Sequence, residues 1–272
     1  MSVRTDTEVE KATSAHGAAS AGSSVGALPS KWQLGGALWL LGMPGVVAVV
    51  WALLPPLRAN EALLPLPLWA VVLLSGLQTS VMLAIAVAVG VWLAARVGLH
   101  APAMSAWMGG KPVGASLRAQ CKPGVLGGMA GAAWLWGLSL VAPVALQPAD
   151  PSSSMPLVVK LLYGGITEEL LMRWGLMTLL LWLGWRVVQR GQGHPGKALV
   201  AGAVLFSAVL FALGHLPAAQ AMAGVLTPQV IAFVLVGNTA FGLVAGWLYA
   251  RHGLEAAIIA HVLAHLLSYP LL

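Results

Sequence analysis

The sequence has 272 residues, of which 59% are hydrophobic and only 8% are charged, whereas ordinary soluble domains carry about 25% charged residues. This composition excludes a soluble fold, because the chain lacks the polar residues that would cover its exterior, and it predicts an all-α protein whose solvent is the lipid bilayer. The net charge of +6 comes without a basic run interleaved with aromatic residues, so nucleic acid is not an expected partner.

Residues 1–30 are polar and rich in Ala, Gly and Ser, a composition that predicts a disordered N-terminal tail. Seven apolar segments follow, at 34–54, 67–95, 124–147, 156–187, 198–216, 228–250 and 254–271. A hydrocarbon core of about 30 Å needs about 20 apolar residues per helix. The sequence therefore predicts a polytopic transmembrane helical bundle of about seven spans. Three N-terminal membrane helices are expected within 31–155, with a loop at 96–123, and a four-helix core within 156–272.

The lysines and arginines are distributed unevenly among the predicted loops. A cytoplasmic N-terminus places only Arg58 and Lys160 on the outer side. It places eleven on the inner side, namely Arg4, Lys11, Lys31, Arg96, Lys111, Arg118, Lys122, Arg186, Arg190, Lys197 and Arg251. The positive-inside rule therefore predicts that the N-terminus and the loop 96–123 are cytoplasmic. Without a targeting signal, the expected location of this multi-pass protein is a bacterial inner membrane.

Six ionisable residues lie inside the predicted C-terminal spans: Glu168, Glu169, Arg173, His215, His261 and His265. A charged group at the bilayer centre costs about 2.5–3.5 kcal/mol even on the mildest scale. These side chains must therefore face one another or a wet cavity. Ionisable residues inside a membrane indicate a functional site.

Within this set, Glu169 and Arg173 are four residues apart, with the acid N-terminal to the base, which is the favourable order for a pair on one helix face. The spacing predicts that Glu169 and Arg173 pair as structural support. Glu168 is rotated by about 100° from Glu169 on an α-helix. Glu168 then has no local partner and is the candidate general base.

The histidines follow the same spacing. His261 and His265 are four residues apart, which suits two imidazoles that converge on one water molecule or one metal ion. Phe211 shares a helix face with His215 and is expected to line the site beside it. Asn238, in the sixth span, either donates into the cavity or bonds a neighbouring helix, and the sequence leaves both options open.

Four motifs in chain order resemble the CPBP family of intramembrane proteases, which includes the type II CAAX prenyl proteases and the Abi proteins linked to bacteriocin processing or immunity. The motifs are Glu168-Glu169-x-x-x-Arg173, Phe211-x-x-x-His215, Phe241-Gly242 with Gly246 and Tyr249, and His261 with a polar residue four positions on. The resemblance covers about residues 156–269. It implies an intramembrane endopeptidase that cuts a membrane-bound peptide or protein, such as a prenylated C-terminus, a leader peptide or a C-terminal sorting tail.

The resemblance also implies roles for the residues. Glu168 and His215 are expected to activate a water molecule, and His261 and His265 to stabilise the oxyanion, without a cofactor. The family usually has Asn where this chain has His265. Because one Glu with three His is a plausible zinc set, a zinc-dependent protease with Glu168, His215, His261 and His265 as ligands is an alternative.

Two other classes of function also place polar residues inside a membrane. A proton- or metal-coupled transporter usually has two related halves and polar residues along a path, but no repeat is visible here and the first three spans lack ionisable centres. A non-catalytic immunity or adaptor protein can keep a protease fold. The phenotype of Glu168→Gln separates these classes, because a scaffold tolerates this substitution.

Overall fold

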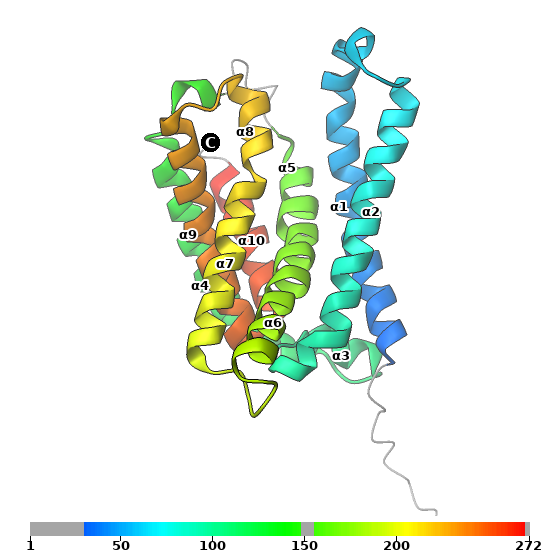
Figure 1. The fold of residues 1–272 in the computed structure, drawn as a ribbon, viewed down its shortest axis with the longest axis vertical. Helices are drawn as coiled ribbons and strands as arrows, with labels where there is room; N and C mark the ends of the chain where they lie inside the picture. The colour runs from blue at the N-terminus through cyan, green and yellow to red at the C-terminus, as the bar shows by residue number, and fades with distance from the viewer. Residues whose placement is uncertain (1–29, 148–154, 270–272) are drawn as a thin grey trace, which may run out of the picture.

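The computed structural model of the chain describes residues 30–147 and 155–269. Helices joined by short connections make up this part of the chain, and it contains no β-strand (Figure 1). The predicted helical membrane bundle is therefore confirmed. The predicted N-terminal tail lies outside the described residues except for Ser30, whose hydroxyl accepts a hydrogen bond from Gln33 N and caps the first helix.

All seven predicted apolar segments contain a helix. The elements are α1 (Lys31–Ala59), η1 (Glu61–Leu63), α2 (Leu68–Leu93), η2 (Ala94–Val97), α3 (Pro102–Met108), α4 (Gly114–Ser139), η3 (Val144–Leu146), α5 (Leu157–Val159), η5 (Lys160–Thr167), η6 (Leu170–Met177), α6 (Thr178–Val188), α7 (Lys197–Gly214), α8 (Leu216–Ala223), α9 (Pro228–His252) and α10 (Leu254–Ser268). In the described residues, five helical stretches are long and apolar enough to cross a membrane. The apolar α10 has only 15 residues, or about 22 Å at 1.5 Å per residue, so the number of spans stays a prediction.

The tertiary packing divides the helices differently from their order in the chain. Helices α1 and α2 form a hairpin that packs on η5 and η6, while α7 packs on α9 (Figure 1). Helix α4 belongs to the predicted N-terminal group, yet it packs chiefly against α10 and also against α9. The glycines of α4 explain this contact, because an added Cβ at Gly128 or Gly131 would overlap α9 or α10 side chains.

The connection before α4 also differs from a simple loop. Residues 100–123 contain the short α3 and the first turns of α4, and Pro123 lies inside α4. The carboxylate of Glu255, at the start of α10, accepts a hydrogen bond from Met104 N of α3 (2.8 Å). Gln120 of α4 accepts one from Ala256 N (3.1 Å). These bonds tie the connection to the start of α10.

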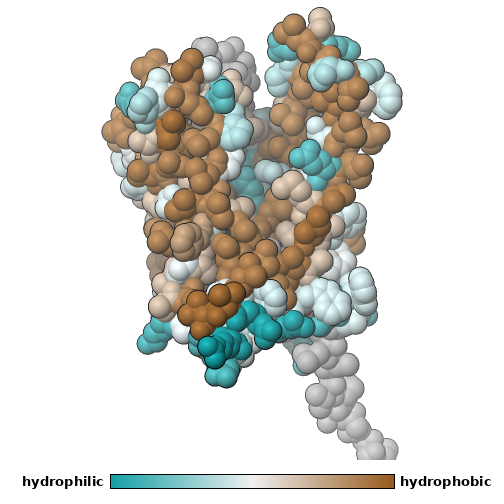
Figure 2. All heavy atoms as spheres, viewed as in Figure 1, coloured by the Kyte–Doolittle hydropathy of each residue, from teal (hydrophilic) through white to brown (hydrophobic). Residues whose placement is uncertain are grey.

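One end of the bundle is hydrophilic, and the sides between the ends are largely apolar (Figure 2). The start of α1, η2, α3, the start of α4, the α6–α7 connection and the end of α9 meet at this end (Figure 1). These elements carry most of the bases that the positive-inside rule assigns to the cytoplasm. The bases share one end, while the side of the membrane that this end faces stays a prediction.

The helix that carries the two glutamates is wound more widely than an α-helix. Both η5 and η6 are π-helical, a form that is rare and frequently occurs at functional sites. The Thr167 hydroxyl donates to Gly42 O of α1 (2.8 Å), and Gly45 of α1 has no room for a side chain against Thr167 and Leu162 O. Helix α1 therefore holds η5 in place just before Glu168.

Candidate active site

The fully buried Glu169 connects two other polar residues of the predicted site. Its Oε2 lies 3.3 Å from Arg173 Nε, so the predicted pair is present. Its Oε1 accepts a hydrogen bond of 2.8 Å from His261 Nδ1 on α10, a contact that helical spacing did not indicate. Glu169 therefore orients an imidazole as well as neutralising an arginine.

Arg173 is held from two sides. Its guanidinium is fully buried and lies over the Phe211 ring, with 5.2 Å between the guanidinium carbon and the ring centroid. None of its three guanidinium nitrogens makes a hydrogen bond within the described part of the chain, so its link to Glu169 is an ion pair. Near Arg173, the Thr178 and Tyr249 hydroxyls are hydrogen-bonded to each other at 2.9 Å, and the Thr178 hydroxyl also donates to the backbone oxygen of Arg173 (3.3 Å). This region joins η6, α6, α7 and α9.

His215 lies at the break between α7 and α8, where Pro217 follows and cannot donate a backbone hydrogen bond. Its Nδ1 lies 2.8 Å from Phe211 O. Because a carbonyl oxygen only accepts, Nδ1 carries the proton and the neutral ring keeps Nε2 as an acceptor. Phe211 also packs edge-on against the His215 ring, with 4.5 Å between centroids. Phe211 therefore lies against His215 and fixes the orientation of its ring through both contacts.

His261 and His265 form a stacked pair on α10, with 4.9 Å between ring centroids and 29° between ring planes. His261 also packs on Phe241 of α9, with 4.6 Å between centroids. A Cβ added to Gly164 of η5 would lie 3.0 Å from His265 Nε2 and 3.9 Å from His261 Nε2. Both Nε2 atoms therefore lie close to Gly164, and a side chain at this position would crowd the His265 ring.

Glu168 differs from Glu169 in that it is only partly buried. Within the described residues its carboxylate has no hydrogen-bond partner, and it interacts electrostatically with His215 and His261. An unbonded carboxylate beside an imidazole that presents Nε2 as an acceptor can bind and deprotonate a water molecule. His215 and His261, from two separate helices, thus pack against the same Phe211 ring, and Glu168 of a third helical segment is in electrostatic range of both.

The structure also describes the surroundings of Asn238 and the grouping of possible metal ligands. The Asn238 amide donates to Val234 O of its own helix (2.8 Å), and it makes no other side-chain hydrogen bond within the part of the chain that the structure describes. Within residues 30–147 and 155–269, no group of three or more His, Cys, Asp or Glu side chains is arranged to hold a metal ion. The zinc-dependent alternative stays a prediction.

Gly164 and Phe241 belong to the site although sequence reasoning gave them no role in it. Phe241 lay in a motif, but its contact with His261 depends on how α9 packs on α10. In the sequence, the pair Gly164-Gly165 within an apolar segment indicates that a neighbouring helix packs closely at this point. Gly165 meets the backbone of Val262 on α10, and Gly164 meets the imidazoles.

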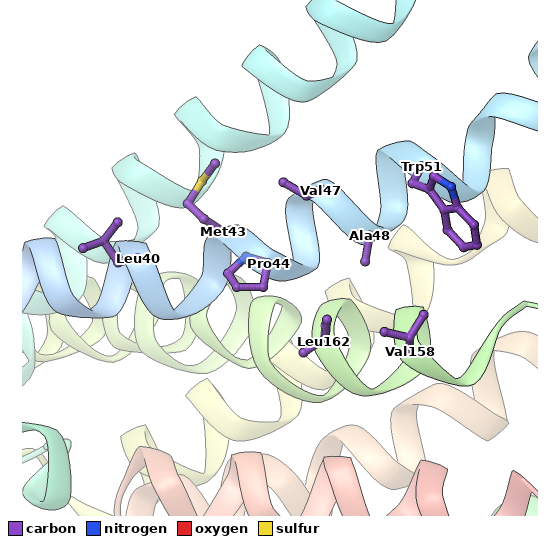
Figure 3. Close-up of a pocket in the computed structure, with 8 residues that line it drawn as sticks. All are labelled: Leu40, Met43, Pro44, Val47, Ala48, Trp51, Val158 and Leu162. Atoms are coloured by element: carbon purple, nitrogen blue, oxygen red, sulfur yellow. The ribbon is translucent and has the colours of Figure 1, made fainter.

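A separate apolar cavity of about 630 Å³ lies on the other side of η5, between this helix and α1 (Figure 3). It is lined by Leu40, Met43, Pro44, Val47, Ala48, Trp51, Val158 and Leu162. Leu162 and Val158 face α1, whereas Gly164 faces α10. This cavity is widely open to the side of the bundle, and its almost wholly apolar lining suits a hydrocarbon chain.

Comparison with protein families found a match over residues 150–267 to the family described as type II CAAX prenyl endopeptidase Rce1-like. The match begins just before α5 and ends within α10, so it includes Glu168, Glu169, Arg173 and the three histidines. Comparisons with curated proteins and with solved structures found no match. The family match confirms the predicted family for the C-terminal segment.

Proposed function

Because residues 150–267 of this multi-pass membrane protein belong to the type II CAAX prenyl endopeptidase Rce1-like family, we propose that the protein is an intramembrane endopeptidase in which Glu168 is the general base. The observation that carries this proposal is that two imidazoles from separate helices pack on one Phe211 ring, in electrostatic range of a carboxylate on a third helical segment. A buried cluster of this kind is costly in a membrane, and packing alone gives no reason for it.

In the proposed reaction, Glu168 removes a proton from a water molecule that His215 Nε2 also holds by accepting its second hydrogen. The water oxygen attacks the carbonyl carbon of the scissile peptide bond, and the carbonyl π electrons move to the oxygen. When the tetrahedral intermediate collapses, the C–N bond breaks and the C=O bond reforms. Glu168 then returns the proton to the departing amine. General acid–base help of this kind is worth about 10²–10⁴-fold in rate.

The two stacked imidazoles are the proposed oxyanion stabilisers. The His265 ring accepts or donates no hydrogen bond within the described residues, so its Nε2–H is free to donate to the oxyanion. His261 Nε2 donates when the ring carries two protons, while Nδ1 stays bonded to Glu169. One such donor contributes about 10²–10³-fold in rate. Arg173 and Glu169 act through His261 and are therefore positioning residues.

The proposed substrate is a membrane-associated peptide or protein. A helix that carries the polar cluster on one side and borders a hydrocarbon-accepting cavity on the other supports a substrate with both a peptide and a lipid-like part. Prenylated C-termini have both parts, and the matched family is named for them. No step of the proposed reaction uses a metal ion.

The experiment compares Glu168→Gln with the matched variant Glu61→Gln, whose side chain is exposed in η1. Each is expressed in a strain that lacks the chromosomal copy, and membrane proteins are compared by terminal proteomics. We expect precursors to accumulate uncut with Glu168→Gln but to be processed with Glu61→Gln. Processing by a well-folded Glu168→Gln protein at the wild-type rate would remove Glu168 from the mechanism.

A further inference from the structure

The connection between α6 and α7 concentrates basic side chains at the hydrophilic end of the bundle. We name residues 186–197 the basic loop. It projects from this end (Figure 1), where hydrophilic side chains gather (Figure 2). Its basic side chains are all exposed, namely Arg186, Arg190, His194 and Lys197. The sequence has no Asp or Glu between residues 170 and 254, and in the part of the chain that the structure describes, no ion pair involves the basic loop.

The basic loop is held in one conformation by two side chains at the end of α6. The Gln189 side chain crosses the loop, because its Oε1 accepts a hydrogen bond from Gly196 N (2.7 Å) and its Nε2 donates to His194 O (3.2 Å). The Trp185 indole N–H donates to Gly193 O (3.1 Å). The bases therefore project from a preformed frame, and binding a ligand there costs little ordering of the backbone.

Two arginines lie close together in this frame. Arg190 has a φ of 54°, a left-handed conformation that glycine adopts more easily and usually occupies after the end of a helix. A Cβ added to the next residue, Gly191, would lie 2.7 Å from Arg186 Nη1. The Arg186 guanidinium therefore lies against the backbone from which Arg190 projects. Two positive charges so close together favour an anion that binds both.

The residues between these two arginines indicate which anion this is. Val187 and Val188 are 77% and 69% exposed. The loop is short and joins two helical stretches long and apolar enough to cross a membrane, Leu157–Val188 and Lys197–Ala223. The valines therefore lie where acyl chains meet lipid headgroups. An acidic protein segment would neutralise the bases but give the valines no apolar contact, whereas an anionic phospholipid satisfies both.

We propose that the basic loop is a binding site for anionic phospholipids. Arg186 and Arg190 bind the headgroup phosphate, for which the planar fork of a guanidinium is well matched. Val187 and Val188 contact the acyl chains, and Lys197 adds to the attraction of the anion. The inference concerns binding alone and does not depend on the proposed endopeptidase function.

The test measures lipid affinity of the full-length protein in detergent micelles by native mass spectrometry. The probes are phosphatidylglycerol and phosphatidylcholine with identical acyl chains, at one fixed ionic strength because salt screens exposed charges. The first variant combines Arg186→Gln with Arg190→Gln. The second is Arg190→Gly, which removes a charge and suits the left-handed backbone. The matched control combines Lys111→Gln with Arg118→Gln, two exposed bases at the same end but outside the basic loop.

We expect the wild type to prefer phosphatidylglycerol. A basic residue near an anionic lipid surface contributes about fivefold in affinity. The Arg190→Gly variant should therefore bind phosphatidylglycerol about fivefold more weakly, and the double loop variant about 25-fold more weakly. Affinity for phosphatidylcholine should not change, and the control pair should bind as wild type. Because glycine suits this position, the Arg190→Gly variant should melt no lower than wild type.

Three results would overturn the proposal. The first is equal affinity of the wild type for the two lipids, or wild-type affinity for phosphatidylglycerol in the double loop variant. The second is the same loss of affinity in the control pair as in the double loop variant, which would show a general effect of surface charge. The third is displacement of phosphatidylglycerol by a competitor that lacks acyl chains: an oligoglutamate peptide would indicate an acidic protein partner, and millimolar inorganic phosphate a simple anion site.

Discussion

The substitution Gly164→Ala tests the geometry of the two imidazoles most directly. The added Cβ would lie 3.0 Å from His265 Nε2, whereas comfortable contact between such atoms is about 3.5 Å. His265 must therefore move by about 0.5 Å. A misplacement of 1 Å at a catalytic group can cost about 10²-fold in rate, so half of that distance is expected to cost about tenfold.

The helix itself should tolerate this alanine, because alanine in a helix interior is more stable than glycine by about 0.5–1 kcal/mol. The neighbouring Gly165→Ala is the matched control. Its Cβ would lie 3.2 Å from the backbone N and Cα of Val262, and backbone cannot turn aside as a ring can. We therefore expect Gly165→Ala to lower the yield of folded protein, and Gly164→Ala to lower kcat in protein of normal yield and melting temperature.

The assay is kcat for a cleaved peptide, measured in nanodiscs beside the melting temperature of each variant. Wild-type kcat in folded Gly164→Ala protein would refute the reasoning, because His265 would then be either elsewhere or without a role. A loss of folded protein in Gly164→Ala equal to that in Gly165→Ala would show that Gly164 packs against backbone rather than against imidazoles.

Two further predictions concern the buried contacts. Glu169→Gln leaves Arg173 without its carboxylate and weakens the bond to His261. Because removing one partner of a buried pair costs about 3–5 kcal/mol, both the melting temperature and kcat should fall. An unchanged melting temperature would contradict the ion pair as described. Gly90→Val should lower the melting temperature without a direct effect on the catalytic step, because even a Cβ at Gly90 would overlap the Trp174 indole. The control is Gly36→Val, at an open position of α1. If both variants melt at the same temperature, the packing of α2 on η6 is contradicted.

Much of the architecture could be predicted from composition and spacing. A bilayer leaves few ways to satisfy backbone groups, so long apolar segments predict helices, and the helix content followed from segment length alone. The i,i+4 spacing of Glu169 and Arg173 predicted their pair because both residues belong to one helix. Within one helix, sequence distance determines spatial distance.

Contacts between helices could not be derived in this way. The bond between Glu169 and His261 joins residues 92 positions apart, and it depends on how α10 packs against η5. The packing of α4 on α10 and the position of Asn238 likewise depend on helix rotation, which periodicity does not determine. The π-helical winding of η5 and η6 also changes which side chains share a face.

The sequence by itself therefore determined the fold class, the helical segments, the family of the C-terminal segment and the set of polar residues that a membrane would not tolerate singly. Only the tertiary structure decided which of these residues touch and that Gly164 lies directly against two imidazoles. The physical reason is that the free-energy cost of burying a side chain in a membrane depends on residue type, which the sequence gives directly. Contacts between helices depend on their relative rotation and depth, which many weak packing interactions set together.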